Sequence, residues 1–277
     1  MTRGQRLTAA LAVAAAVLLI GRAAAVVYSS REWYVNIGAT SVWNERVTST
    51  TWIYCATMLV GLVFAWMNVS AVRRSVAALI VPKRIANVEF GEEVPSTRLR
   101  ALTAAVSLGI AVVSLAAAPS WTTLALWRSN VVFAETDPYF TLDLSHFVSW
   151  LPLEIGAYQW CLTLFSITAI LVVALYSLTP SLSWDQHGLH VTPHVRRHMS
   201  VLGALLLLFA AWGFRLDAFR ELVHGSGIDG VLTRTDHVWL IPTYLALSLV
   251  SIGAAVVLVV AGWMGQTTTA LASVSVV

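Results

Sequence analysis

The sequence has few charged residues and almost none inside its long apolar stretches. Only 11% of its 277 residues are Asp, Glu, Lys or Arg, and 58% are hydrophobic. Soluble domains usually contain about 25% charged residues, so this composition excludes an ordinary water-soluble fold. The 17 basic residues are spread along the chain. No dense basic cluster is present, and nucleic acid is therefore not an expected partner.

Motifs for catalysis and cofactor binding are also missing from the sequence. It contains no Walker loop, dinucleotide fingerprint, HExxH zinc motif or nucleophile elbow. No histidine lies in the middle of an apolar stretch, where an axial haem ligand would be needed. No Asp, Glu or Lys lies near the centre of one, as a proton relay would require. We therefore expect no enzymatic activity and no cofactor.

What the sequence does contain is a set of six apolar stretches, each close to the length that crosses a bilayer. An α-helix rises about 1.5 Å per residue, so roughly 20 apolar residues span the hydrocarbon. We predict an all-α fold, a polytopic transmembrane helical bundle without a large soluble domain, with residues 1–277 as a single transmembrane domain. The predicted spans are residues 7–28, 50–69, 101–120, 156–178, 200–216 and 239–264.

The distribution of basic residues predicts the orientation. With the N-terminus in the cytoplasm, ten Lys and Arg residues lie on the cytoplasmic side and six on the outer side. Cytoplasmic loops of membrane proteins carry such an excess. We predict that both termini are cytoplasmic, with cytoplasmic loops at 71–100 and 179–199 and an outer segment at 121–155. The alternative for the first span is a secretory signal cleaved near residues 23–25.

The third predicted span, 101–120, is made largely of Ala, Val, Ser and Gly. Small residues let neighbouring helices approach closely. We therefore expect this helix to be the most buried of the bundle.

A few polar groups lie within the predicted spans. Arg22 could be a counter-ion or gating residue, or its side chain could extend to the outer headgroups. Cys55 and Cys161 lie at similar depths, so they could form a disulfide or remain two inert thiols.

Four histidines fall within twelve residues on the predicted cytoplasmic side. Imidazoles at this spacing could bind Zn²⁺ or another borderline metal if one helix aligned them. Gly188 and Pro193 interrupt that helix, so the alternative is that they are interfacial residues facing lipid headgroups. The four are His187, His190, His194 and His198.

Acidic residues of the predicted outer segment form a second group of candidates. Glu135, Asp137 and Asp143 could bind Ca²⁺ through carboxylate oxygens. The alternative is that these side chains form turns and cap backbone groups.

Three ordered segments resemble a known family. NVVFAETDPYFTLDLSHFVSWLP, at 130–152, is similar to the pattern D-P-x-F-x-x-D-x-x-F-Y-x-F-x-L-P, with His146 in place of the first of two aromatics. LDAFREL, with Asp217, resembles L-D-x-[FY]-x-x-L and follows an apolar span preceded by Arg197, His198 and Met199. The third segment contains Asp236 and Pro242, with Arg234 in place of a tyrosine.

These segments are similar to those of the bacterial membrane proteins grouped as uncharacterised protein family 0182. The resemblance covers about residues 30–260. It implies a multi-pass protein of the bacterial cytoplasmic membrane and corresponds to the N-terminal membrane portion of the family. Members typically continue into a further span and a large extracytoplasmic domain. The resemblance implies no particular biochemical activity.

Taken together, these observations predict a non-catalytic integral membrane protein that is an accessory or scaffold subunit of a larger membrane complex. Its expected partners are the lipid bilayer and other membrane protein subunits. The alternative is a transporter or channel for a lipid or other apolar cargo, with Arg22 and residues 121–155 as its gate. A third hypothesis is a metal-dependent membrane enzyme that uses the four histidines.

Overall fold

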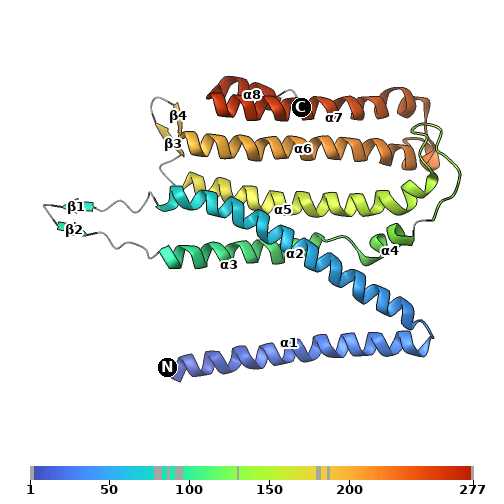
Figure 1. The fold of residues 1–277 in the computed structure, drawn as a ribbon, viewed down its shortest axis with the longest axis horizontal. Coiled ribbons are helices and arrows are strands. Elements are labelled where there is room, and N and C mark those ends of the chain that lie inside the picture. Colours follow the sequence, from blue (N-terminus) through green and yellow to red (C-terminus); the bar gives the residue numbers. More distant parts are fainter. Residues whose placement is uncertain are drawn as a thin grey trace. The chain divides into compact units, whose positions relative to one another are not determined.

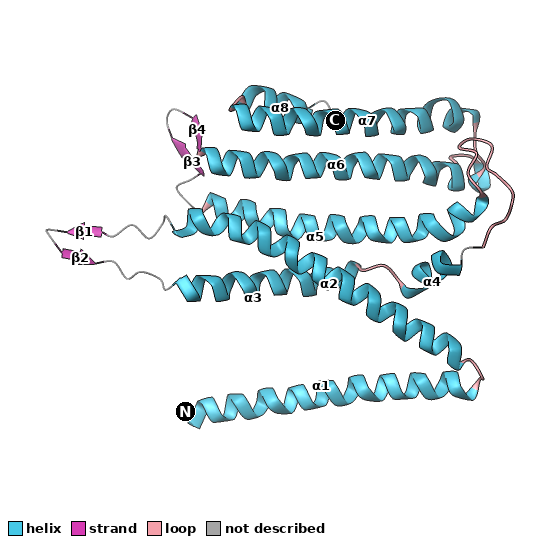
Figure 2. Cartoon of the chain, viewed as in Figure 1, coloured by secondary structure: helices cyan, strands magenta, loops and turns pink. Residues whose placement is uncertain are grey.

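The computed structural model of the protein describes residues 3–77, 83–85, 88–90, 96–129, 131–178, 182–185 and 188–275. Its contacts divide the chain into two compact units, Met1–Trp52 and Ile53–Val277. Within these described ranges, six helices are long and apolar enough to cross a membrane. The predicted all-α membrane bundle is confirmed, and two short β-hairpins are added to it (Figures 1 and 2).

The elements follow one another along the chain as coloured in Figure 1. The helices are α1 (Arg3–Asn36), α2 (Thr40–Ala77), α3 (Ser96–Ser114), α4 (Trp121–Ser129), α5 (Leu151–Ser177), α6 (Pro193–His224), α7 (Ile241–Met264) and α8 (Thr267–Ser275). The strands β1 (Lys83–Ile85) and β2 (Val88–Phe90) form one antiparallel hairpin, and β3 (Leu182–Asp185) and β4 (Gly188–Val191) form another. Short 3₁₀ turns are Leu115–Ala117 and Ile228–Gly230, and π-helical turns are His146–Trp150 and Asp236–Leu240.

The first unit contains α1 and the beginning of α2. Both helices continue past the predicted spans 7–28 and 50–69, so only three residues, 37–39, connect them. Apolar length limits how much helix fits in the hydrocarbon, but a helix itself ends where a residue such as glycine can reverse the chain. Gly38, at φ +74°, does so here. Beside it, the rings of Trp33 and Tyr34 lie 4.9 Å apart.

The second unit is built around α5, α6 and α7, which lie side by side (Figure 1). α6 and α7 share the most extensive helix contact, and α2 and α3 pack against α5. One core cluster brings together Val72 of α2, Phe165 and Val172 of α5, and Leu202 of α6. Lipid tails are as apolar as these side chains, so the clusters stabilise the bundle mainly through close packing.

Small residues bring α6 and α7 together. A Cβ on Gly203 would lie 2.8 Å from a methyl group of Leu258, and a Cβ on Gly262 would overlap the side chain of Ser200. Ser248 of α7 also donates a hydrogen bond to the carbonyl of Ala211 at 2.8 Å. Glycine therefore sets the short distance between these two helices.

The expectation that span 101–120 is the most buried helix is wrong. Within the second unit, α6 has the largest buried share among the helices that could cross a membrane. One face of α3 does pack, through Ile110 and Ala111, but Leu102, Leu108 and Val113 are exposed. Small residues permit a close approach on the face that meets a neighbour, and they do not bury the other faces of the helix.

The two ends of the second unit differ in structure. The two hairpins lie at the end where α3 and α6 begin, which we name the hairpin end (Figure 1). The irregular segments 131–145 and 225–235, together with α4, lie at the opposite end, which we name the loop end.

Candidate functional site at the loop end

Asp137 organises the first irregular segment of the loop end. Its carboxylate accepts hydrogen bonds from the backbone N–H groups of Tyr139 (2.9 Å), Phe140 (2.6 Å) and Leu142 (2.8 Å). Pro138 follows it and has a fixed φ, which favours the turn. The side chain is only 4% exposed. A buried carboxylate with three N–H donors is a turn-forming group, and the segment depends on it for its shape.

Asp143 closes the same segment. It accepts hydrogen bonds from the backbone N–H groups of Ala134 (2.9 Å), Phe133 (3.3 Å) and Ser145 (2.8 Å). Hydrogen bonds from the hydroxyl and the N–H of Ser145, followed by those from the other two residues, lower the pKa of Asp143 below its usual 3.8. The group is therefore an ionised acceptor at neutral pH. Asp137 and Asp143 both take the role that the turn-forming alternative describes.

Asp236 fixes the shape of the second irregular segment, 225–235, through hydrogen bonds of the same kind. It is fully buried and accepts hydrogen bonds from the N–H of Ser226 (2.9 Å), the N–H of Thr233 (2.8 Å) and the Ser226 hydroxyl. The carboxylate thus ties the end of α6 to the start of α7. We name residues 131–145 and 225–237 together the loop platform.

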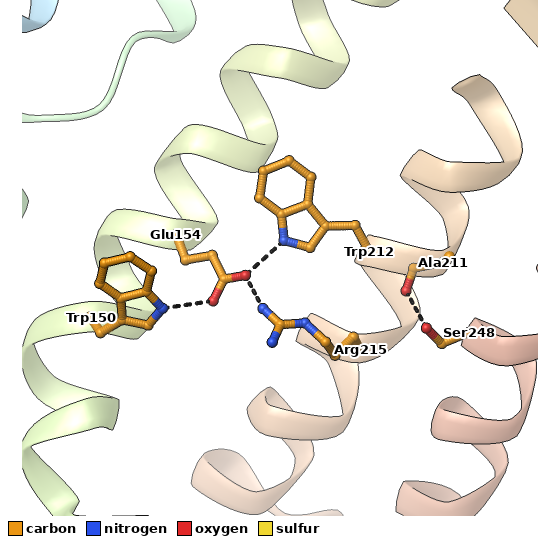
Figure 3. A network of polar contacts seen from close by, with 6 residues as sticks. All are labelled: Trp150, Glu154, Ala211, Trp212, Arg215 and Ser248. Atoms are coloured by element: carbon orange, nitrogen blue, oxygen red, sulfur yellow. Dashed lines mark hydrogen bonds and ion pairs between the residues drawn. The ribbon is translucent and has the colours of Figure 1, made fainter. Parts of the chain in front are cut away.

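A network of polar contacts joins α5 and α6 (Figure 3). Glu154 of α5 is 9% exposed and accepts hydrogen bonds from the indole N–H groups of Trp150 (3.1 Å) and Trp212 (2.8 Å). It also forms an ion pair with Arg215 of α6. Burying a carboxylate is costly unless it is paired and hydrogen-bonded. Glu154 meets that requirement with three donors.

Aromatic contacts join the three segments on which the family resemblance rests. The ring of Phe140 lies 4.8 Å from that of Phe219 on α6, and the ring of Tyr139 lies 4.9 Å from that of His237. His146, which stands in place of an aromatic, packs its ring 5.6 Å from Phe219. Its Nε2 atom is buried and has no hydrogen-bond partner within the described part of the chain. The imidazole therefore packs as the replaced aromatic ring would.

An apolar groove of about 510 Å³ opens beside these contacts. The Asp137 carboxylate lies at its wall, where its oxygens are already hydrogen-bonded to the backbone. Apolar side chains from both segments of the loop platform and from α6 form most of its lining. They include Phe133, Leu144, Phe147, Val148, Leu222 and Leu232.

The remaining sequence candidates lie apart from these networks. Glu135 is exposed, and Asp217 is a half-buried residue of α6 that pairs with Arg220 at 2.9 Å. Arg22 lies on α1, in the first unit. Cys55 and Cys161 are both free thiols.

His194 and His198, two of the four predicted histidines, lie at the hairpin end. His187 and the side chain of His190 lie outside the described residues. Pro193 begins α6, so His194 and His198 are one helical turn apart. Among the described residues, no group of three or more His, Cys, Asp or Glu side chains is placed to hold a metal ion. Metal binding therefore stays a prediction.

His198 instead joins three helices. Its Nδ1 lies 2.7 Å from the hydroxyl of Tyr176 on α5, and its Nε2 lies 3.1 Å from Oδ1 of Asn68 on α2. The amide of Asn68 donates to the carbonyl of Phe64 at 2.8 Å, so Oδ1 is left as an acceptor. This arrangement assigns the His198 proton to Nε2, and the Tyr176 hydroxyl then donates to Nδ1.

Sequence reasoning missed the partners in both networks. Trp150 and Glu154 are four residues apart, and Trp212 and Arg215 are three apart, which is the spacing of side chains on one helix face. That signal was available. Asn68 and Tyr176 are far from His198 in the sequence, and no local pattern indicates that they meet.

Comparisons with known proteins identify one family. The model of a family described as "Uncharacterised protein family (UPF0182)" matches residues 7–277. A UPF0182 protein of Cupriavidus necator is 24% identical over 255 residues, which cover 91% of this chain and 28% of the relative. One of Synechococcus sp. is 34% identical over 108 residues, which cover 39% of this chain and 13% of the relative. One of Frankia alni is 28% identical over 165 residues, which cover 60% of this chain and 16% of the relative.

The chain therefore spans less than a third of the length of these curated relatives. No solved structure matches it. The family resemblance inferred from the three segments is confirmed.

Proposed function

The chain belongs to the uncharacterised protein family UPF0182, and we propose from its loop end that it acts as a non-catalytic accessory or scaffold subunit of a larger membrane complex. The chain is a membrane protein with six helices that could cross the bilayer. In this proposal the loop platform and its apolar groove receive an apolar segment of another membrane protein.

The observation that supports this role is the combination of a fixed backbone and an open apolar groove. Asp137, Asp143 and Asp236 each accept at least two backbone N–H hydrogen bonds. A carboxylate occupied in this way is a poor general base, and it holds the irregular segments in one conformation. A preorganised apolar surface binds a partner with little further loss of conformational entropy.

The proposed location is the bacterial cytoplasmic membrane, with both termini in the cytoplasm. The excess of basic residues in the loops 71–100 and 179–199 supports this orientation. The hairpin end would then face the cytoplasm and the loop end the outer side. A cysteine introduced at Ile85 or Ile228, after Cys55 and Cys161 are changed to serine, tests the orientation. A membrane-impermeant maleimide added to whole cells should label position 228 and leave position 85 unlabelled; the reverse pattern would overturn it.

The scaffold role is tested by purification of the full chain in mild detergent, with quantification of every co-purifying membrane protein. We expect one partner at near-stoichiometric amounts. Leu144→Trp, which fills the groove, should reduce its recovery about tenfold, as expected for a central interface residue. The control is Val132→Trp, at an exposed position outside the groove. Equal recovery of the partner with the wild type, Leu144→Trp and Val132→Trp would refute the proposal.

The alternative function is transport of a lipid or other apolar cargo. The volume and apolar lining of the same groove favour it, since about 510 Å³ of apolar space can take part of an acyl chain. The same preparation separates the two functions. A monodisperse protein that carries bound lipid, releases it in the Leu144→Trp variant and has no stoichiometric partner would favour transport.

The hypothesis of a metal-dependent enzyme has a direct test on that sample. We expect metal analysis to find less than about 0.1 equivalent of zinc, copper or iron. A genuine site, in which metal binding is coupled to folding, would instead be close to fully occupied. A stoichiometric metal that is lost in His190→Ala and His194→Ala would establish a site.

A further inference from the structure

A second groove lies at the hairpin end, where α2, α3 and α5 meet. It has a volume of about 130 Å³. The hydroxyl of Thr103, one of its few polar groups, is hydrogen-bonded to the carbonyl of Leu99 at 2.8 Å. The rest of the lining is apolar apart from Arg73. The apolar lining residues include Val69, Val72, Leu102, Val106, Leu171 and Leu175.

The charged residues that the structure describes along this groove are positive. Arg73, near the end of α2, is half-buried and belongs to the lining. Leu99, also in the lining, is flanked along α3 by Arg98 and Arg100, which are both exposed. No carboxylate belongs to the groove lining as the structure describes it. A cation at the edge of an apolar slot attracts a ligand that has both an anionic group and a hydrocarbon chain.

The shape of the groove decides which ligand of this kind fits. A helix with its side chains is about 10–12 Å across and rises about 5.4 Å per turn, so one turn fills roughly 400–600 Å³. The slot, with about 130 Å³, is too small for it. Soluble phosphate would gain nothing from the apolar walls. Leu102, at the edge of the slot, is 61% exposed, so the groove opens on the outer surface of the second unit. An acyl chain can enter a slot with this opening from the bilayer.

We propose that the groove between α2, α3 and α5 binds an anionic phospholipid, with part of an acyl chain among its apolar residues and the phosphate group on Arg73. The expected orientation agrees with this site. Basic residues predict that the hairpin end faces the cytoplasm, and anionic lipids give the cytoplasmic leaflet its negative surface. A lipid bound there would hold α2 and α3 against α5. The hairpin of β1 and β2 connects α2 to α3 at the same end.

The test is native mass spectrometry of the full chain in mild detergent with added phosphatidylglycerol or phosphatidylcholine. The wild type should retain phosphatidylglycerol with about fivefold preference, the value expected for one Arg near an anionic headgroup. Arg73→Gln should bring the preference close to one. Arg197→Gln is the matched control, because it removes an exposed Arg at the hairpin end, on α6 and outside the groove.

A second variant tests the slot. Leu102→Trp changes an exposed residue and should lower the retention of both lipids without changing the preference between them. Folding of each variant is checked by its melting temperature and circular dichroism. An equal preference in the wild type and Arg73→Gln would overturn the proposal, as would a loss of preference in Arg197→Gln as large as that in Arg73→Gln. Competition by glycerol 3-phosphate would also overturn it, since the site would then bind the headgroup without the chain.

Discussion

The loop end and the hairpin end of the second unit use different polar groups. At the loop end, the carboxylates of Asp137, Asp143 and Asp236 accept hydrogen bonds from the backbone of irregular segments. At the hairpin end, the imidazole of His198 is hydrogen-bonded to the side chains of Tyr176 and Asn68. These neutral groups come from three different helices.

The difference follows from the state of the backbone. A helix satisfies its own N–H and C=O groups, so helices that lie side by side need only a few side-chain contacts between them. Irregular chain leaves N–H groups without partners, and near a membrane water does not replace them at low cost. A carboxylate can accept several of these hydrogen bonds at once. The carboxylates of Asp137, Asp143 and Asp236 therefore take up N–H groups that the irregular backbone leaves without helical partners.

Among the changes that test this comparison, Glu154→Ala should have the largest effect on stability. The change leaves two indole N–H groups without their acceptor and Arg215 without its partner. Arg215 is 43% exposed and can recover some hydration, so we expect a loss of about 3 kcal/mol in the free energy of unfolding. Thermal unfolding in detergent measures it.

The control for this change is Asp217→Ala. It removes a partly exposed ion pair between Asp217 and Arg220, which both lie on α6, and should cost less than about 1 kcal/mol. Glu154→Gln should fall between the two, because an amide oxygen still accepts from indole. Equal effects of Glu154→Ala and Asp217→Ala would mean that the buried network does not stabilise the loop end.

At the hairpin end, packing should matter more than polar groups. In Gly262→Val the new side chain would overlap Ser200 and push α7 from α6, at a cost of about 2 kcal/mol. Gly253→Val, on the same helix, has nothing within 4 Å of its Cβ position and is the matched control. A melting temperature lowered equally by both variants would show that helix propensity, and not the helix contact, is responsible.

The polar contacts of the hairpin end should have a smaller effect. We expect His198→Ala to cost about 1 kcal/mol, since the Tyr176 hydroxyl and the Asn68 amide oxygen lose their hydrogen bonds to the imidazole but both groups are neutral. Tyr176→Phe removes only the hydroxyl, so a double-mutant cycle with His198→Ala isolates the hydrogen bond between the Tyr176 hydroxyl and the imidazole. A coupling energy of zero would show that this hydrogen bond adds nothing to stability.

The smallest expected effect is a local change with acid. Because folding lowers the pKa of Asp143 below 3.8, its stabilising contribution is present above the unfolded value and is lost as pH falls through the folded value. Amide hydrogen exchange in 131–145 should therefore rise relative to the hairpin end below about pH 4. Asp143→Asn should show faster exchange at every pH. A pH-independent difference in the wild type would contradict this role.

Much of the fold could be predicted from the sequence, because apolar length and charge distribution are local properties. The six long helices among the described residues follow from apolar length, and the family follows from the three segments that resemble it. The ends of the helices were less predictable: α6 begins at Pro193, within a stretch of polar residues that the apolar pattern assigns to a loop. Proline fits the first helical turn, where it loses no hydrogen bond.

The candidate site could be predicted only in part. Asp137, Asp143 and Asp236 were found from turn chemistry and the resemblance, and the structure gives them backbone partners. The role of Glu154 depends on Trp212 and Arg215, which come from another helix. Such contacts follow from how helices pack against each other, and a single sequence contains little information on this.

The π-helical turns before α5 and α7 limit how this protein can tolerate insertions and deletions. Each turn contains one residue more than an α-helical turn and is followed by a proline, Pro152 or Pro242, in the first helical positions. Removing one residue there would rotate everything that precedes the helix by about 100° around its axis. The two hairpins at the other end lie outside the helices, so a change in their length rotates no helix about its axis. We therefore expect the fold to tolerate insertions and deletions in the hairpins but not beside Pro152 and Pro242.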